Sequence, residues 1–201
     1  MYLRRLELYD FKAFELAKFE FPPPRPNKNV ILIGGRNGFG KTTLFEALAI
    51  GLFGRDGIRL VARARPGAEP TDRAETFARF MERALFAEAL ARGRSRCRIV
   101  SIFQDEEGEP IEIYRTWHFS DSGHLRPRGE EVHIVRGWKR EVVAPPADDT
   151  DPDAWYREWI FRTFMPVNQV AFFCSTARKS LRTPSARPGN KCAKYWTAYS
   201  V

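Results

Sequence analysis

Alternating hydrophobic and polar residues predict two extended segments at the start of the chain. The sequences YLRRLELYDF and AFELAKFEF are rich in aromatic and aliphatic residues, and they are split near positions 10–13. A proline cluster at positions 22–26 closes the second segment. Two such runs joined by a short turn are typical of a β-hairpin. The chain is therefore predicted to open with a hairpin.

A short, continuous apolar run, NVILI at positions 29–33, comes next and is bounded by Pro26 and by Gly34. A run of this kind is typical of a strand buried on both faces, as in a parallel sheet. The segment 41–53 then has helical spacing, and Gly54 stands where a C-terminal cap would. The predicted order is strand, glycine-rich turn, helix. The apolar positions on one face of that helix are Leu44, Ala47, Leu48 and Leu52.

The remaining pattern predicts a mixture of helices and an antiparallel meander. Residues 71–91 have the apolar stripe of a second helix, with Thr71 and Asp72 as N-cap candidates. A linker, APPADDTDPD, precedes an aromatic-rich amphipathic helix at 153–164. Between these helices, three strands joined by turn-like connections are expected at 96–103, 110–119 and 131–138.

Length and composition favour one globular domain, or a domain with a subdomain. The chain has 201 residues, of which 43% are hydrophobic, enough to bury a core without a disulfide or a metal. Its three cysteines do not make a disulfide framework. The sequence contains neither an apolar run of membrane-spanning length nor the apolar centre of a signal peptide. A cytoplasmic location is therefore expected.

The positive charge is concentrated at the C-terminal end. The formal net charge is +8, from 33 basic and 25 acidic residues. Residues 174–201 contain six basic residues and no acidic one, which leaves 27 basic against 25 acidic residues before them. The body of the chain is thus nearly neutral, and net charge alone is weak evidence for a polyanionic partner such as DNA.

The sequence GRNGFGKT at positions 35–42 matches the phosphate-binding loop G-x-x-x-x-G-K-[ST]. Glycines allow backbone amides to approach phosphates, and the lysine should reach the β and γ phosphates. Thr42 should offer its hydroxyl to Mg²⁺, so ATP and Mg²⁺ are the expected cofactors. The residues predicted to line the nucleotide are Gly35, Arg36, Asn37, Gly38, Phe39, Gly40, Lys41, Thr42 and Thr43.

Sequence on both sides of this loop resembles a known family. LRRLELYDFKAFE, the loop and ALAIGLFG together resemble the N-terminal half-head of SMC-like ATPases such as SbcC and RecF. EIYRTW and VAFF add a closer resemblance to DndD, the ATPase of phosphorothioate DNA-modification and restriction systems. The resemblance implies an α/β P-loop NTPase fold, an ABC/SMC-like N-terminal lobe with an antiparallel subsheet and a parallel core. It also implies that Lys12 lies near the nucleotide, and it leaves the role of Arg115 and Trp117 unassigned.

Such ATPases hydrolyse ATP after a C-terminal half-head supplies the signature motif and the Walker B acidic pair, and when two heads close over two nucleotides. The acidic run at 105–107 does not end an apolar strand, and its sequence favours a solvated turn. No catalytic residue is therefore assigned to this chain. The resemblance implies DNA and other system subunits as partners of the intact protein.

The resemblance covers residues 1–173, so residues 174–201 form a separate basic tail in the predicted division of the chain. Reading inferred codons for 175–179 in a shifted frame gives Asp-Gly-Glu-Lys, which matches how the family continues. A frameshift near Phe173 is therefore hypothesised, with a disordered or out-of-frame tail. Two alternatives stay open: a non-catalytic, nucleotide-gated interaction module, and a DNA-binding protein that uses the tail. A nucleotide kinase is weaker, because no lid or acceptor pocket is found.

Overall fold

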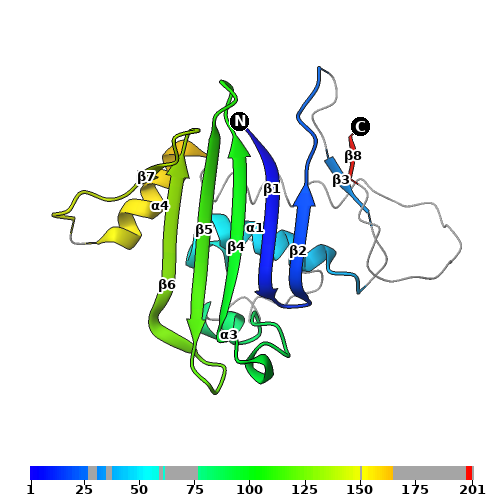
Figure 1. Ribbon diagram of the computed structural model, residues 1–201, viewed down its shortest axis with the longest axis vertical. Helices are drawn as coiled ribbons and strands as arrows, with labels where there is room; N and C mark the ends of the chain where they lie inside the picture. Colours follow the sequence, from blue (N-terminus) through cyan, green and yellow to red (C-terminus); the bar gives the residue numbers. More distant parts are fainter. Residues whose placement is uncertain are drawn as a thin grey trace, which may run out of the picture.

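An antiparallel sheet of six strands forms the centre of the molecule (Figure 1). The computed structural model describes residues 1–26, 31–34, 38–58, 61, 77–149, 151–164 and 198–200. In spatial order the sheet runs β2, β1, β4, β5, β6, β7. Its strands are β1 (Tyr2–Phe11), β2 (Phe14–Glu20), β4 (Arg96–Gln104), β5 (Pro110–Phe119), β6 (Leu125–Arg136) and β7 (Glu141–Val143).

The predicted hairpin and meander are both present. Phe11 pairs with Phe14 across the tight turn of the β1–β2 hairpin. Strands β4, β5 and β6 follow one another as antiparallel neighbours. Strand β6 begins at Leu125, six residues earlier than predicted, because Leu125 pairs with Phe119 beyond a register shift. The segment expected to be only a connection therefore contributes to the sheet.

Helix α1 (Lys41–Phe53) lies across one face of this sheet, behind β1, β4 and β5 in the view of Figure 1. Gly51 permits close approach, since a Cβ placed there would lie 2.7 Å from Ile99 Cγ2 on β4. Alternate residues of the strands supply the apolar layer beneath the helix. That layer includes the fully buried residues Leu6, Leu8, Ile99, Ile113 and Trp117.

The predicted helix at 71–91 is wrong over its second half. Among the described residues, α3 covers only Phe77–Glu82, and the short 3₁₀ helix η3 covers Leu90–Arg92. Between them the backbone pairs with the β1–β2 turn: Lys12 N donates to Ala84 O at 2.7 Å, and Phe86 N donates to Asp10 O at 2.8 Å. These tertiary hydrogen bonds replace the helical ones. Residues 71–76, with both N-cap candidates, lie outside the described part.

The parallel core remains a prediction. Strand β3 (Ile31–Ile33) coincides with part of the apolar run at 29–33, but it pairs antiparallel with β8 (Ala198–Ser200). Every strand pair in the described ranges is antiparallel, so those ranges confirm the predicted subsheet only. Positions 174–197 lie outside these ranges, and the division into residues 1–173 and 174–201 is untested.

Helix α4 (Pro152–Thr163) packs beside the end of α1 and confirms the helix predicted at 153–164. Asp151 caps it by accepting a hydrogen bond from Ala154 N at 3.0 Å. The rings of Phe53 and Phe161 lie 6.0 Å apart, which joins the two helices. No helix in the part of the chain that the structure describes is long and apolar enough to cross a membrane.

Candidate nucleotide-binding site

The described end of the phosphate loop has the backbone conformation that its glycines were expected to allow. Gly38 has a φ of 86° and Gly40 a φ of 84°. Both values lie in the left-handed region, which costs a residue with a Cβ about 1–2 kcal/mol. Gly35, Arg36 and Asn37 lie outside the described residues, so their predicted roles are untested. Gly38, Phe39 and Gly40 lead directly into α1.

Gly40 is also held by a side chain from the opening hairpin. A Cβ placed on Gly40 would lie 2.6 Å from Phe14 Cζ, so the Phe14 ring already occupies that space. The Phe14 ring in turn meets Phe19 edge to face, with centroids 5.9 Å apart. Phe14 belongs to FKAF, the end of the LRRLELYDFKAFE segment that carries the family resemblance. This segment therefore lies against the last glycine of the loop and links β1 and β2 to the loop's position.

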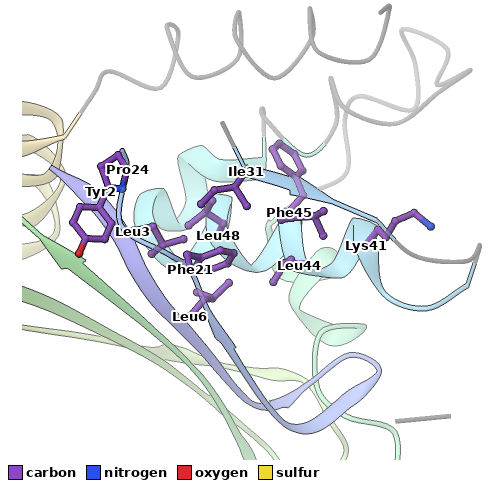
Figure 2. A pocket seen from close by; sticks show the side chains of 11 residues that line it. Tyr2, Leu3, Leu6, Phe21, Pro24, Ile31, Lys41, Leu44, Phe45 and Leu48 are labelled. Atoms are coloured by element: carbon purple, nitrogen blue, oxygen red, sulfur yellow. The ribbon is translucent and has the colours of Figure 1, made fainter. Parts of the chain in front are cut away.

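The first turn of α1 presents the groups that phosphate binding requires. Gly40 occupies the N-cap position and, having no side chain, leaves the first-turn amides without a side-chain cap. Uncapped amides and the helix dipole favour an anion at this end. Figure 2 shows Lys41 at the same end, with its amine directed away from the apolar residues around it. Thr42 is exposed and Thr43 half-buried beside it.

These residues fit Mg²⁺ only together with the nucleotide. Thr42 offers a hydroxyl oxygen at an exposed position, a hard ligand of the kind that Mg²⁺ accepts. Within the described residues, no cluster of three His, Cys, Asp or Glu side chains could hold a metal. Mg²⁺ commonly keeps several waters and binds phosphate oxygens, so Thr42 would hold it together with the phosphates of a nucleotide.

Lys12 lies in the β1–β2 turn and is engaged by a residue of α1. Its Nζ lies 2.6 Å from Glu46 Oε2 and 4.2 Å from the centroid of the Phe80 ring. The exposed fractions of the two side chains are 19% for Lys12 and 5% for Glu46, so this ion pair is largely desolvated. Glu46 was not predicted as part of the site. Contact between Lys12 and nucleotide remains a prediction.

An apolar groove of about 500 Å³ runs beside α1, where Leu3 and Leu6 of β1 also line it (Figure 2). Leu44, Phe45 and Leu48 line it from the helix, opposite Phe21 and Ile31. Lys41 stands at one end of it. Helix α1 therefore presents apolar residues to this groove as well as to the strands beneath it.

Arg115 joins the sheet to the last turn of α1, a role that sequence did not predict. It is 7% exposed on β5. Its Nε and Nη2 donate to the carbonyl oxygens of Gly51 and Leu52, both at 3.1 Å, and its Nη1 pairs with Glu130 on β6. Arg115 and Trp117 form an R-x-W pattern within the EIYRTW motif, and Trp117 is fully buried in the core.

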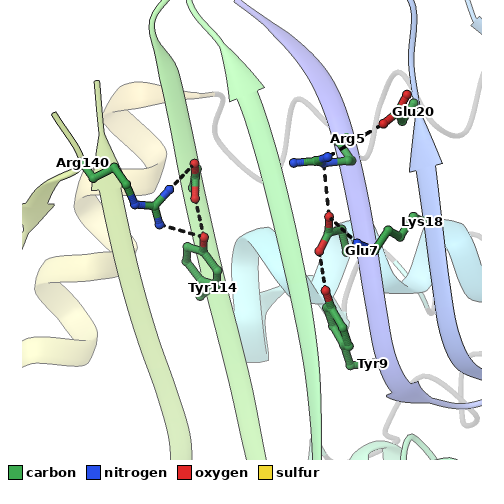
Figure 3. Close-up of polar contacts among 8 residues, drawn as sticks. Arg5, Glu7, Tyr9, Lys18, Glu20, Tyr114 and Arg140 are labelled. Atoms are coloured by element: carbon green, nitrogen blue, oxygen red, sulfur yellow. Dashed lines mark hydrogen bonds and ion pairs between the residues drawn. The ribbon is translucent and has the colours of Figure 1, made fainter. Parts of the chain in front are cut away.

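The opposite face of the sheet carries paired charges. Figure 3 shows Arg5 and Lys18 directed at Glu7, whose carboxylate also accepts from the Tyr9 hydroxyl at 2.6 Å. This hydrogen bond is the main reason that the pKa of Tyr9 is raised. On the far side of β4, Arg140 contacts Glu112 and Tyr114 in the same way. These arginines are therefore partly neutralised by their neighbours.

Two other sequence interpretations have clear outcomes. The acidic run at 105–107 is a turn, since Asp105 Oδ1 accepts from the backbone N of Glu107 at 3.0 Å and of Glu109 at 2.8 Å. The turn is as predicted, but the run directly follows the largely buried strand β4, so the expectation that it does not end an apolar strand is wrong. As a large aromatic residue, Trp138 is predicted to be a core or subdomain contact, but it is 68% exposed.

A phosphate loop with left-handed glycines, placed at the start of a helix that packs on an antiparallel sheet, defines a P-loop ATPase domain. The chain belongs to the AAA domain family, which it matches over residues 5–140. It is also similar to the Septu protein PtuA of Bacillus mycoides (strain KBAB4), with 23% identity over 176 residues. That match covers 84% of this chain and 21% of PtuA, so the chain spans about a fifth of its relative's length.

Proposed function

We propose that this chain is the Mg²⁺–ATP-binding N-terminal part of an SMC-like ATPase that acts in DNA modification, restriction or repair. The observation that carries the proposal is the start of α1, where uncapped amides, Lys41 and Thr42 follow two glycines in the left-handed conformation. Membership of the AAA domain family supports nucleotide binding. The resemblance of its flanking sequence to DndD supports the DNA-directed role.

In this mechanism the chain's own residues bind and orient the nucleotide. The first-turn amides and Lys41 would hold the phosphate oxygens, and the Thr42 hydroxyl would be a ligand of the metal that accompanies them. Mg²⁺ supplies charge neutralisation at the β and γ phosphates when it is bound. The described residues offer no acidic group at the loop to position water, so hydrolysis depends on a second half-head.

The apolar groove along α1 supports such a completion. It is lined from α1, β3 and the opening hairpin, and Ile33 at its edge is 42% exposed. The relative PtuA is about five times longer than the part matched here. We infer that a later segment of the intact protein covers this groove, and that two completed heads then pair around nucleotide.

Calorimetric titration of the chain with Mg²⁺–ATP tests the nucleotide-binding claim. Lys41→Ala removes a charge-assisted contact of about 1.5–3 kcal/mol, so affinity should fall about 10- to 100-fold. Lys139→Ala is the matched control, because Lys139 is exposed in the β6–β7 turn. Equal ATP affinity in wild type and Lys41→Ala would contradict the proposal.

Two further measurements separate this function from its alternatives. The chain alone should show little Mg²⁺-dependent ATPase activity, and rates equal to an intact family member's would contradict the need for completion. DNA binding should survive deletion of residues 174–201 if the body carries it. Complete loss of DNA binding on that deletion would favour a DNA-binding protein that uses its basic tail.

A further inference from the structure

Two sequence motifs that lie far apart in the chain meet at the C-terminal end of α1. ALAIGLFG ends α1, whereas EIYRTW lies on β5, more than sixty positions later. Arg115 of the second motif reaches the Gly51 and Leu52 carbonyls of the first. The carbonyls at a helix C-terminus lack helical partners, and a buried cation there also complements the helix dipole.

The glycine that follows α1 leaves the room that this contact needs. Gly54 has a φ of 52°, and a Cβ placed on it would lie 2.6 Å from Arg115 Nη1 and 2.9 Å from Glu130 Oε1. Its N–H donates to Ile50 O and closes the last turn. Gly54, Arg115 and Glu130, which we call the helix clamp, therefore fit together as one unit.

The clamp and the phosphate loop hold opposite ends of the same rigid element. Helix α1 has 13 residues and is about 20 Å long. At its N-terminal end Phe14 packs on Gly40, and at its C-terminal end Arg115 takes two carbonyls and Glu130. A shift at either end moves the other, because a packed helix translates as a body.

We propose that Arg115 is a positioning residue for nucleotide binding: by fixing the C-terminal end of α1 on the sheet, it sets the position of the phosphate loop at the other end. The inference rests on the proposed function, because the loop's role is nucleotide binding. Arg115 lies at the end of α1 opposite the phosphate loop, and it acts through the helix alone. This assigns a role to the arginine of the R-x-W feature.

The test compares Arg115→Lys with two controls in the full chain. Lysine keeps the charge but loses the planar fork that reaches both carbonyls and Glu130. Arg98→Lys is the matched control, because Arg98 lies on the other face of the sheet, where its Nε donates to Thr116 Oγ1 at 3.0 Å. Ile134→Ala, at a fully buried site on β6, lowers the melting temperature without touching the clamp.

Two readouts are measured below the melting transition: Mg²⁺–ATP affinity, and hydrogen exchange of amides 38–44 without nucleotide. Arg115→Lys should weaken ATP binding about 3- to 30-fold and speed exchange at 38–44. Arg98→Lys and Ile134→Ala should change neither. Glu130→Gln, which spares the carbonyl contacts, should give a smaller change in the same direction.

The inference is overturned if Arg115→Lys lowers the melting temperature as Ile134→Ala does, but leaves both readouts unchanged. Absence of ATP binding by the wild-type chain would instead contradict the proposed function. The exchange readout still decides the positioning role in that case, since it needs no nucleotide.

Discussion

The two ends of α1 are built for opposite purposes. At the N-terminal end, Gly40 supplies no side-chain cap for the first-turn amides, and Lys41 lies at the same end. At the C-terminal end, Gly54 N–H and the Arg115 guanidinium satisfy the last carbonyls. The same backbone geometry thus leaves donors available at one end and consumes acceptors at the other. Side chains decide which end of a helix binds a ligand and which end is anchored.

Gly40→Ala should break the binding end most severely. The new Cβ requires a left-handed alanine and displacement of the Phe14 ring, which together cost about 2–5 kcal/mol. Binding of Mg²⁺–ATP should fall below detection by calorimetry. Gly34→Ala is the control, because nothing lies within 4 Å of its added Cβ. Equal ATP affinity in the two variants would show that the Gly40–Phe14 contact does not shape the loop.

Gly54→Ala should disrupt the contact that anchors the C-terminal end of α1. Its cost in stability should be smaller than that of Gly40→Ala. A left-handed alanine costs about 1–2 kcal/mol, and moving Arg115 adds a similar amount. Gly93→Ala isolates the first contribution, since Gly93 has a φ of 70° but nothing within 4 Å of an added Cβ. Chemical denaturation of both variants measures the difference. Identical losses of stability would argue against a tightly fitted clamp.

How much of this contrast could be predicted differs between the two ends. The loop and Lys41 follow from a local motif, and Gly54 was predicted as a C-cap from its position after the helix. Arg115 could not be placed, because its contact depends on which strand lies beneath the last turn of α1. The R-x-W pattern is visible in the sequence, but it does not say what Arg115 contacts. That contact can be inferred only when the position of β5 beneath α1 is known.

Dependence on long-range contacts also explains the errors in the predicted helices and strands. Helical periodicity at 71–91 was outweighed by backbone hydrogen bonds between Ala84, Phe86 and the β1–β2 turn, which are long-range contacts. The early start of β6 depends on pairing across a register shift. By contrast, β1, β2, β4 and β5 follow from local alternation and were predicted within one or two residues.

A double-mutant cycle on Lys12 and Glu46 sharpens the comparison near the binding end. Their largely buried ion pair should give a coupling energy of about 1–2 kcal/mol in the free energy of unfolding. The cycle uses Lys12→Met, Glu46→Gln and both together. If Lys12 also contacts nucleotide, Lys12→Met should weaken ATP binding more than Glu46→Gln. A coupling energy near zero would mean that the pair does not tie the turn to α1.

The smallest expected effect is on how stability depends on pH, through Asp10 at the end of β1. Burial raises the pKa of Asp10 and outweighs the nearby Arg94, which lowers it. Because the pKa is higher in the folded state than in the unfolded state, the folded chain binds this proton more tightly. Stability from Asp10 is therefore present below its ordinary pKa of 3.8 and is lost as pH rises through the folded value. Chemical denaturation across this pH window should show that the free energy of unfolding falls less with rising pH for Asp10→Asn than for wild type. An unchanged profile would contradict this.

Hydrogen exchange along α1, with and without Mg²⁺–ATP, tests most directly whether one end binds and the other anchors. Amides 38–44 should exchange quickly in the nucleotide-free chain and become protected when Mg²⁺–ATP is added. Amides 50–54 should be protected in both states, because they donate within the helix, as Gly54 N does to Ile50 O, and the clamp fixes the carbonyls of the same turn. No change at 38–44, or protection that appears only at 50–54, would contradict the account.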